Sequence, residues 1–386
     1  MKLYQNINSL EKKIISKINR FEISKTDMNE LLSIFKDKNI LIMGAAGSIG
    51  YQFTKDLLKN FSVFKNLYLV DKNENELTEI NRNLIINYHK KGIFYICSDI
   101  INLDIDELIS KNKIHILLNF SAIKHVRSEE NYHSSRYMFL TNSIYFLPKK
   151  KLTLEKVFSV STDKTVNPKS ILGISKNLME KKLTNFGRNN KVFVSTTRFA
   201  NVSFSNGSIL KYVYERLSAK KIFGIPDKIK RYFITHEEAS ALCMKALLER
   251  YDNQILIPNP KIIGKDFLIK DLTKKIASIL KIQIKFIKKE KDLNIKNKIL
   301  NVLLTKPNSH GQKINEQLFS DDEKIYYDKN DKSIIFTKMP KFDKSLKKYL
   351  KKIISQKNLQ DIKKVIKQKY KDFKLSSKVI SISKTI

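Results

Sequence analysis

The sequence predicts an α/β fold with a doubly wound parallel sheet, and three observations point to it. From residue 39 onward, short apolar runs alternate with helical stretches, which is the order of βαβ units. A glycine-rich turn separates the first run from the helix that follows it. The chain has 386 residues and a hydrophobic content of 42%, enough to bury one large core or two moderate ones. We expect residues 37–200 to form the larger domain.

The expected elements follow in chain order. Residues 1–36 have the pattern of a polar amphipathic helix, with Thr26 as a helix cap, and are expected to form an N-terminal extension. Strands of the larger domain are expected at NILIMG, NLYLVD, GIFYICSD, IHILLNFSA, KVFSVST and KVFVSTTRFA, because each run is short, apolar and bounded by polar turns.

The second half of the chain is less regular. Strands are expected at NQILIPNP and IQIKFIKK, and an amphipathic helix at IKDLTKKIASILK. Residues 201–330 are therefore expected to form a smaller C-terminal lobe that binds the substrate. A hairpin is expected at EKIYYDKNDKSIIFTKMP, and residues 331–386 are expected to be a lysine-rich helical tail.

The charge balance is strongly basic, with 74 Lys and Arg residues against 38 Asp and Glu residues and a net charge of +36. The excess is mostly lysine and is spread along the chain, with extra weight after Pro340. This spread favours compositional drift over a nucleic-acid groove, so we do not expect nucleic acid as the main partner.

Two cysteines, Cys97 and Cys243, lie far apart without a metal-like spacing, so neither a disulfide framework nor a metal site is expected. The N-terminus lacks the pattern of a signal peptide, and no apolar run approaches the length of a membrane helix. We expect a cytoplasmic protein without a transmembrane segment.

A dinucleotide loop is predicted at KNILIMGAAGSIGYQFTKDLLKN, which has the order strand, glycine turn, helix. Gly44, Gly47 and Gly50 would supply the tight turn, the close approach of the backbone to a pyrophosphate and the packing of helix on strand. Ser48 and Ile49 complete the loop. The pattern predicts a Rossmann-type cofactor site.

Two acidic residues end the next strands. Asp71 lies about 20 positions beyond Gly50, where an acid accepts hydrogen bonds from the adenosine ribose hydroxyls, and this favours NAD. Lys72 is suited to a 2′-phosphate, which keeps NADP as the alternative. Asp99 is placed to contact the adenine or, equally, to cap a helix.

A second candidate site lies in VSTDKTVNPKSILGISK, residues 160–176. Asp163 and Lys164 follow the strand KVFSV, at the sheet edge where ligands bind, and form a potential acid and base. The alternative interpretation is that Asp163 and Lys164 are a surface-exposed pair at a strand end without a catalytic role. Lys176 lies one helical turn beyond Leu172, so both would face the same site if this segment is helical.

Six motifs resemble those of the nucleotide-sugar 4,6-dehydratases, which are extended short-chain dehydrogenases. They are ILIMGAAGSIG, SAIKHVRSEEN, STDKTVNPKSILGISK, RFANVSFSNGS, RYFITHEEA and HGQKINEQLFSDDE. The chain is most similar to the polysaccharide-biosynthesis branch that acts on UDP-N-acetylglucosamine, over residues 21–322. The resemblance implies transient oxidation at carbon 4 by NAD, loss of water across carbons 5 and 6, and return of the hydride to carbon 6.

The resemblance also implies roles for single residues. Asp163 would be the acid for the departing hydroxyl and Lys164 the base at carbon 5, while Thr162 would hydrogen-bond the 4-hydroxyl. Lys176 would hold the nicotinamide ribose. Leu172 stands where short-chain dehydrogenases carry the tyrosine that accepts a proton, and the large membrane-anchored members carry methionine there. An active enzyme and a dead copy are both compatible with this position, and we expect the former.

Further residues are implied to bind ligands. Ser121 would contact the cofactor, and the substrate-binding candidates are Lys124, His125, Asn142, Asn201, Ser208 and Arg231. Arginine suits a phosphate because its planar fork forms paired charged hydrogen bonds. Asn206, His310 and Gln312 depart from the family pattern. A nucleotide-sugar epimerase or reductase and a non-catalytic binding homologue remain alternatives, and a homo-oligomer is expected.

Overall fold

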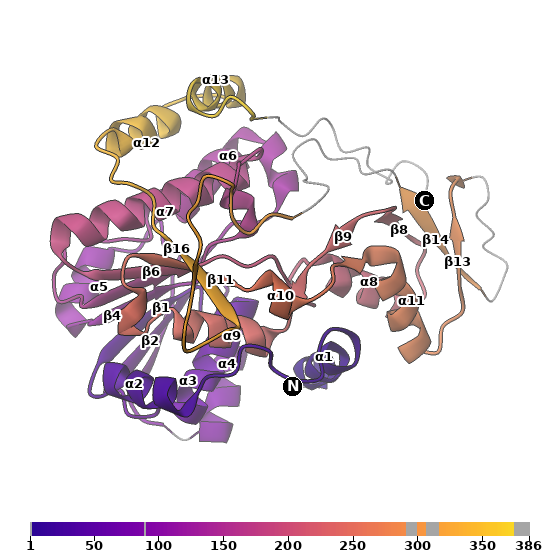
Figure 1. Ribbon diagram of the computed structural model, residues 1–386, viewed down its shortest axis with the longest axis horizontal. Coiled ribbons are helices and arrows are strands. Elements are labelled where there is room, and N and C mark those ends of the chain that lie inside the picture. Colours follow the sequence, from indigo (N-terminus) through magenta and orange to yellow (C-terminus); the bar gives the residue numbers. More distant parts are fainter. Residues whose placement is uncertain (1, 89, 291–298, 306–315, 374–386) are drawn as a thin grey trace.

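The computed structural model describes residues 2–88, 90–290, 299–305 and 316–373, and its centre is a nine-stranded sheet (Figure 1). The strand order is β15-β16-β11-β6-β5-β4-β1-β2-β3. The bounds are β1 (Asn39–Met43), β2 (Asn66–Asp71), β3 (Ile93–Cys97), β4 (Ile116–Asn119), β5 (Lys156–Ser159), β6 (Phe193–Thr197), β11 (Gln254–Pro258), β15 (Tyr326–Tyr327) and β16 (Ile334–Lys338). From β3 to β11 the strands are parallel, which confirms the Rossmann-type doubly wound sheet.

Helices cover both faces of this sheet, which explains why its central strands are continuous apolar runs. Helices α3 (Ser48–Asn60), α4 (Glu74–Tyr88) and α9 (His236–Lys245) lie on one side, and α6 (Tyr132–Phe139) and α7 (Ile171–Asn190) on the other (Figure 1). All residues of β1 and β4 are buried. The strand order reverses between β1 and β4, and at such a point the loops after the two strands diverge and leave room for a ligand.

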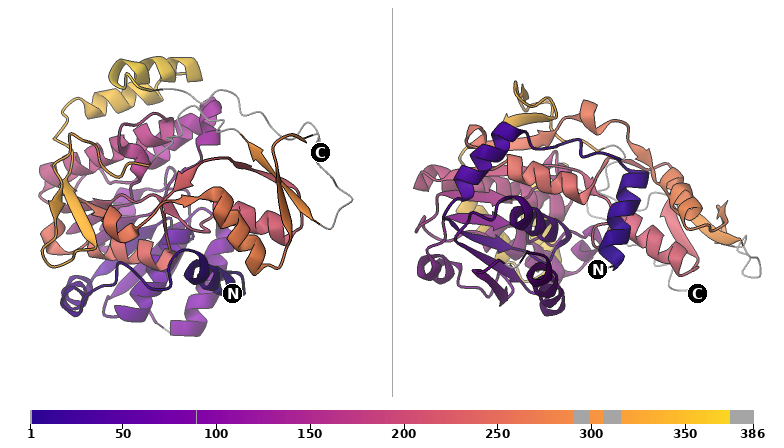
Figure 2. Two further views of the ribbon diagram at one scale, coloured as in Figure 1. Left: turned by 45° about the vertical axis from the view of Figure 1, so that its right-hand side comes forward. Right: turned by 90° about the horizontal axis from the view of Figure 1, so that it is seen from below.

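The smaller lobe is built on the three-stranded sheet β13-β14-β8 (Figure 2). It comprises β7 (Asn201–Val202), α8 (Ile209–Ser218), β8 (Phe223–Pro226), β9 (Lys230–Arg231), β10 (Phe233–Ile234), β12 (Phe267–Leu268), α11 (Ile269–Ile279), β13 (Ile284–Ile287) and β14 (Leu300–Thr305). Its apolar core also includes Ile7, Leu10 and Ile14 of α1 (Lys2–Ile14). The N-terminal helix is therefore part of this lobe's packing.

Several expected boundaries do not follow the packing. β11 lies beside β6 in the central sheet and β16 lies beside β11, so the segments at 254–258 and 334–338 extend that sheet instead of belonging to the lobe and the tail. β11 is apolar and almost wholly buried because it covers the edge that β6 would otherwise expose. Helix α2 (Lys25–Phe35) is capped by Ser24 and not by Thr26.

The lysine-rich tail is helical over its described part. Helices α12 (Leu346–Ile354) and α13 (Leu359–Lys369) pack their apolar faces on α6 and α7, in a cluster that includes Leu172, Leu350 and Ile366. The remaining helices are α5 (Ile105–Asn112) and α10 (Pro260–Ile263). Within the described ranges, we find no helix with the length and apolarity needed to cross a membrane.

Candidate active site

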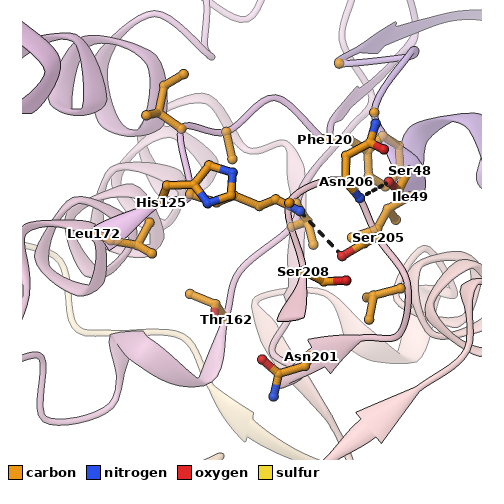
Figure 3. A pocket seen from close by; sticks show the side chains of 18 of the residues that line it. Ser48, Ile49, Phe120, His125, Thr162, Leu172, Asn201, Ser205, Asn206 and Ser208 are labelled. Atoms are coloured by element: carbon orange, nitrogen blue, oxygen red, sulfur yellow. Dashed lines mark hydrogen bonds between the residues drawn. The ribbon is translucent and has the colours of Figure 1, made fainter. Parts of the chain in front are cut away.

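A cavity of about 690 Å³ lies at the carboxyl ends of the parallel strands, between the central sheet and the smaller lobe (Figure 3). The turns after β1 to β6 form one wall, and residues of the lobe form the other. All but one of the predicted site residues line it, namely Gly44, Gly47, Ser48, Ile49, Gly50, Asp71, Asp99, Ser121, Lys124, His125, Thr162, Asp163, Lys164, Lys176, Asn201, Ser208 and Arg231.

The glycine loop forms one end of the cavity. Gly44 has φ +76°, and a Cβ there would lie 2.5 Å from the backbone nitrogen of Ser121. A Cβ at Gly50 would lie 2.2 Å from the Gly44 carbonyl oxygen. Helix α3 starts at Ser48 with Gly47 as its cap, so no side chain satisfies its first N–H groups. The loop has the close packing that the sequence predicts.

Asp71 and Asp99 lie beside this loop. The Asp71 carboxylate accepts hydrogen bonds from the backbone N–H groups of Ala46 at 2.9 Å and Asn73 at 3.0 Å. Lys72 donates to the Tyr137 hydroxyl at 2.9 Å, and this hydroxyl donates in turn to the Asp99 carboxylate. Tyr137 was not predicted, because it comes from α6 and only the fold brings it to the end of β3.

The Asp–Lys pair, Asp163 and Lys164, follows β5. Asp163 is buried, and its Oδ1 accepts hydrogen bonds from Thr162 Oγ1 at 2.8 Å and from Lys164 Nζ at 3.1 Å. Burial lowers the pKa of Lys164, but the negative charges of Asp163 and then Glu316 outweigh burial, so this pKa lies above its usual value. Lys164 is therefore held as an ammonium beside Asp163.

Helix α7 brings Lys176 to the same place. A Cβ at Gly173 would lie 2.3 Å from the Lys164 carbonyl oxygen, so the segment after β5 rests directly on the first turn of the helix. Lys176 is buried, and its Nζ donates to the Val160 carbonyl at 3.0 Å. Burial lowers the pKa of Lys176 to about 8, although Glu180 opposes the shift.

Leu172 presents an apolar side chain to the cavity and is 3% exposed (Figure 3). It packs in the cluster formed with α12 and α13. The backbone N–H groups of Ile171 and Leu172 both donate to the buried Glu129 carboxylate at 2.9 Å. Burial raises the pKa of Glu129 to about 7 against the effect of these donors. Glu129 thus fixes the start of α7.

The loop at residues 203–208 closes the cavity from the side of the lobe. The backbone N–H of Asn206 donates to Ser48 Oγ at 2.9 Å (Figure 3). The His125 ring packs against Gly207, where a Cβ would lie 2.3 Å from the ring. Ser208 caps α8. This loop therefore ties the smaller lobe to the glycine loop.

Lys124 extends toward the same loop, with its Nζ 3.5 Å from Ser205 Oγ. Burial, followed by the positive charges of Lys164 and Lys211, lowers the pKa of Lys124 to about 8. This part of the cavity therefore concentrates positive charge, which suits an anionic ligand.

Asn142 is the predicted residue that does not line the cavity. It is fully buried, its Oδ1 accepts from the Ile123 N–H at 2.9 Å, and its Nδ2 donates at 3.0 Å to both the Ile123 carbonyl and Ser175 Oγ. Asn142 faces inward from the π-helical turn at Leu140–Ile144. Its place in the fold is to join the turn after β4 to α7, and its expected contact with the substrate stays a prediction.

Glu316 is a cavity residue that the sequence did not reveal. Its carboxylate accepts hydrogen bonds from Asn201 Nδ2 at 2.7 Å and from the Tyr232 N–H at 2.8 Å, and lies 3.3 Å from Arg231 Nε. The available signal was its place in the motif HGQKINEQLFSDDE. His310 and Gln312 of that motif lie outside the described residues.

The fold and the glycine loop place the chain among the Rossmann-type α/β proteins. Residues 40–338 match the family described as "Polysaccharide biosynthesis protein", and the chain belongs to this family.

Two curated relatives illustrate the likeness. The capsular polysaccharide biosynthesis protein CapD of Staphylococcus aureus is 27% identical over 326 residues, which cover 81% of this chain and 53% of that protein. This chain thus spans about half the length of that relative. The UDP-N-acetylglucosamine 4,6-dehydratase (inverting) of Campylobacter jejuni is 25% identical over 58% of this chain and 68% of its own length.

The fold is also similar to a solved structure of UDP-glucuronic acid 4-epimerase from Bacillus cereus, determined in complex with UDP-glucuronic acid and NAD. The TM-score is 0.57 at 18% identity, over 73% of this chain and 90% of that one. At this identity the likeness concerns the fold.

Proposed function

We propose that this protein is a nucleotide-sugar 4,6-dehydratase that uses NAD and converts UDP-N-acetylglucosamine, or a related UDP-N-acetylhexosamine, into a 4-keto-6-deoxy sugar for surface polysaccharide or glycan synthesis. The observation that carries the proposal is the hydrogen-bonded Asp–Lys pair, which lines one cavity together with the glycine loop and Lys176. The likeness to the Campylobacter enzyme supports the substrate class.

The residues around the glycine loop fit NAD. A Cβ at Gly44 or Gly50 would fill space that the loop needs, and the uncapped N–H groups at the start of α3 suit a pyrophosphate. Asp71 would accept from the adenosine ribose, Asp99 and Ser121 would contact the cofactor, and Lys176 would hold the nicotinamide ribose. Lys72 is bonded to Tyr137, which favours NAD over NADP. When bound, NAD would take up a hydride from the sugar and return it.

The Asp–Lys pair suits the loss of water because its two members can exchange one proton, which rests on Lys164. Transfer of that proton from Lys164 to Asp163, across the 3.1 Å hydrogen bond, produces a neutral amine and a carboxylic acid. The amine takes the proton from carbon 5, and the acid protonates the hydroxyl that leaves carbon 6 as water. Elimination leaves the pair as ammonium and carboxylate, and the Lys164 ammonium would then return a proton to carbon 5 as the hydride adds to carbon 6.

Two other residues support this chemistry. The Thr162 hydroxyl donates to Asp163, so its lone pairs are oriented to accept from the sugar 4-hydroxyl. Lys176, with its lowered pKa, provides a positive charge that favours loss of the proton from that hydroxyl. This proton would pass to water, and Lys164 would regain one from water at the end of the cycle. Leu172 takes no part in proton transfer.

The test is mass spectrometry of UDP-N-acetylglucosamine incubated with the protein and NAD, where a product lighter by one water is expected. Asp163→Asn and Lys164→Ala should each lower the rate by about 100-fold or more, because general acid and base catalysis contribute about that much. UDP binding, measured by calorimetry, should survive both changes. Full activity in either variant would contradict the proposal.

A second candidate function is a non-catalytic nucleotide-sugar binder, favoured by Leu172 in place of the proton-accepting tyrosine. Binding of NAD and UDP-sugar without any turnover would support it. A product that keeps its 6-hydroxyl would point instead to an epimerase or reductase.

A further inference from the structure

The segment that follows Glu316 is packed against the central part of the fold. Leu318 lies in the main core, and Glu323 is paired with Arg198 Nη1 at 2.8 Å. Arg198 also binds the buried Glu180 of α7 at 2.7 Å. These contacts connect the segment that follows Glu316 to α7, the helix that carries Lys176.

The Glu316 carboxylate is surrounded by polar partners. Its side chain is 4% exposed, and both oxygens accept hydrogen bonds, from Asn201 and from the Tyr232 backbone. The charged groups that face it are Arg231 on β9, and Asp163 and Lys164 on the segment after β5. Two of these neighbours, Asp163 and Lys164, are residues that the proposed reaction requires.

We propose that Glu316 is a positioning residue of the active site, which in its ionised form holds Arg231 and Asn201 in place and sets a negative charge beside the Asp–Lys pair. The inference rests on the proposed function. The buried ion pair is the physical reason, because an ionised Glu316 fixes the Arg231 guanidinium at 3.3 Å while a neutral one does not. The negative charge of Glu316 also helps Lys164 to stay protonated, so that the Asp–Lys pair keeps the proton that the reaction needs.

The ionisation of Glu316 falls in an accessible pH range. Burial, and then the charge of Asp163, raise the pKa of Glu316 to about 7, while Lys164 and Arg231 oppose the shift. The ionised form therefore becomes dominant as the pH rises through neutrality. The proposal predicts that the activity of the natural protein rises over the same range.

The test compares the natural protein with Glu316→Gln, which keeps the shape and an acceptor for the Tyr232 N–H. We expect kcat/KM for water loss to rise through about pH 7 in the natural protein. In Glu316→Gln the rise should disappear, with a rate lower by about 10-fold or more at pH 7.5, below the pKa of Lys176, as for loss of a charged hydrogen bond. Glu316→Asp, which restores the charge, should recover part of the rise.

The matched control is Glu323→Gln, the same change seven residues further on, where the carboxylate binds Arg198 and not Arg231. This variant should unfold at a lower temperature and keep the rise through neutral pH. If Glu316→Gln also keeps that rise, or if Glu323→Gln loses it, the inference is overturned.

A second readout does not depend on activity. Because folding raises the pKa of Glu316 from 4.5 to about 7, its protonated form stabilises the natural protein at low pH. This stabilisation is complete below pH 4.5 and is lost as the pH rises through 7. Relative to the natural protein, Glu316→Gln should therefore gain about 1–3 °C in Tm between pH 5 and pH 8. If this gain appears but no water is lost from any UDP-sugar, the proposed function fails while the environment of Glu316 stands. Without the gain, the inference fails whatever the activity.

Discussion

Gly44 illustrates, for one residue, how closely the predicted cofactor loop is packed. It combines a positive φ with a backbone neighbour 2.5 Å from where a Cβ would lie, whereas Gly264 has a similar φ of +81° and nothing within 4 Å. The two positions therefore separate the cost of backbone conformation from the cost of a clash.

Gly44→Ala should destabilise the fold by about 3 kcal/mol or more and abolish NAD binding, because strain and a backbone clash add. Gly264→Ala should cost less, about 1–3 kcal/mol, because its φ of +81° and ψ of −148° lie in a region that almost only glycine adopts, and should leave NAD binding intact. Denaturant unfolding and calorimetry measure both effects. Equal costs at the two positions would contradict this reading.

Single residues also show what the sequence could not reveal. Asp71, Asp163 and Lys164 were predictable because each follows a recognisable strand, and parallel strands deliver their carboxyl ends to one edge. The burial of Asn142 away from the cavity lining could not be predicted, because its helix pattern did not specify which face points inward. Glu316 could not be identified because its partners, Asn201 and Arg231, lie about a hundred residues earlier in the chain and only folding brings them together.

At the scale of elements, the N-terminal extension is part of the fold. Arg20 donates to the buried Glu238 carboxylate of α9 at 2.6 and 2.7 Å, and also to the carbonyls of Phe233 and Ile263. Glu11 of α1 lies 2.8 Å from His236 Nδ1. The sequence predicted helices in this region but not where they dock, because amphipathicity identifies an apolar face and not its partner.

Arg20→Met should lower the free energy of unfolding by about 3 kcal/mol or more, because Glu238 would be left as a buried charge without its partner. The matched control is Arg82→Met, which removes an exposed pair with Glu79 and should cost less than about 0.5 kcal/mol. Chemical denaturation of both variants tests the difference. A small loss in Arg20→Met would contradict the stabilising role of the Arg20–Glu238 pair.

At the scale of the whole molecule, the order of the sheet explains which parts of the fold were predictable. The parallel core from β1 to β6 follows chain order closely enough for a pattern of alternating runs to reveal it. β11 and β16 join the sheet only after the chain has passed through the smaller lobe. Their position depends on the free edge of β6, which no local sequence pattern indicates. The expected homo-oligomer and cytoplasmic location stay predictions.

Buried lysines give the whole fold a distinctive response to pH. Burial lowers the pKa of Lys124, Lys176 and Lys182 to about 8, so between pH 8 and pH 10 the unfolded chain binds more protons than the folded one. The cost of burying these lysines is thus present below pH 8 and is relieved as the pH rises.

Lys182 lies away from the cavity lining, where its Nζ donates to the Ile144 carbonyl, and it isolates this effect. The free energy of unfolding of Lys182→Met should exceed that of the natural protein at pH 7, because the variant has no ammonium to bury. This excess should be smaller at pH 10 by roughly 1 kcal/mol or more. Unfolding curves at the two pH values provide the comparison. If the variant and the natural protein differ in stability by the same amount at both pH values, the lowered pKa of Lys182 is contradicted.

The contact of Gly173 with the Lys164 carbonyl has a consequence for how the proposed active site could change. Because the segment after β5 packs on the first turn of α7, Asp163, Lys164 and Lys176 are held together. Under the proposed function, we expect substitutions on the opposite wall, in the loop at 203–208 and β9, to alter which sugar is accepted without displacing these three residues.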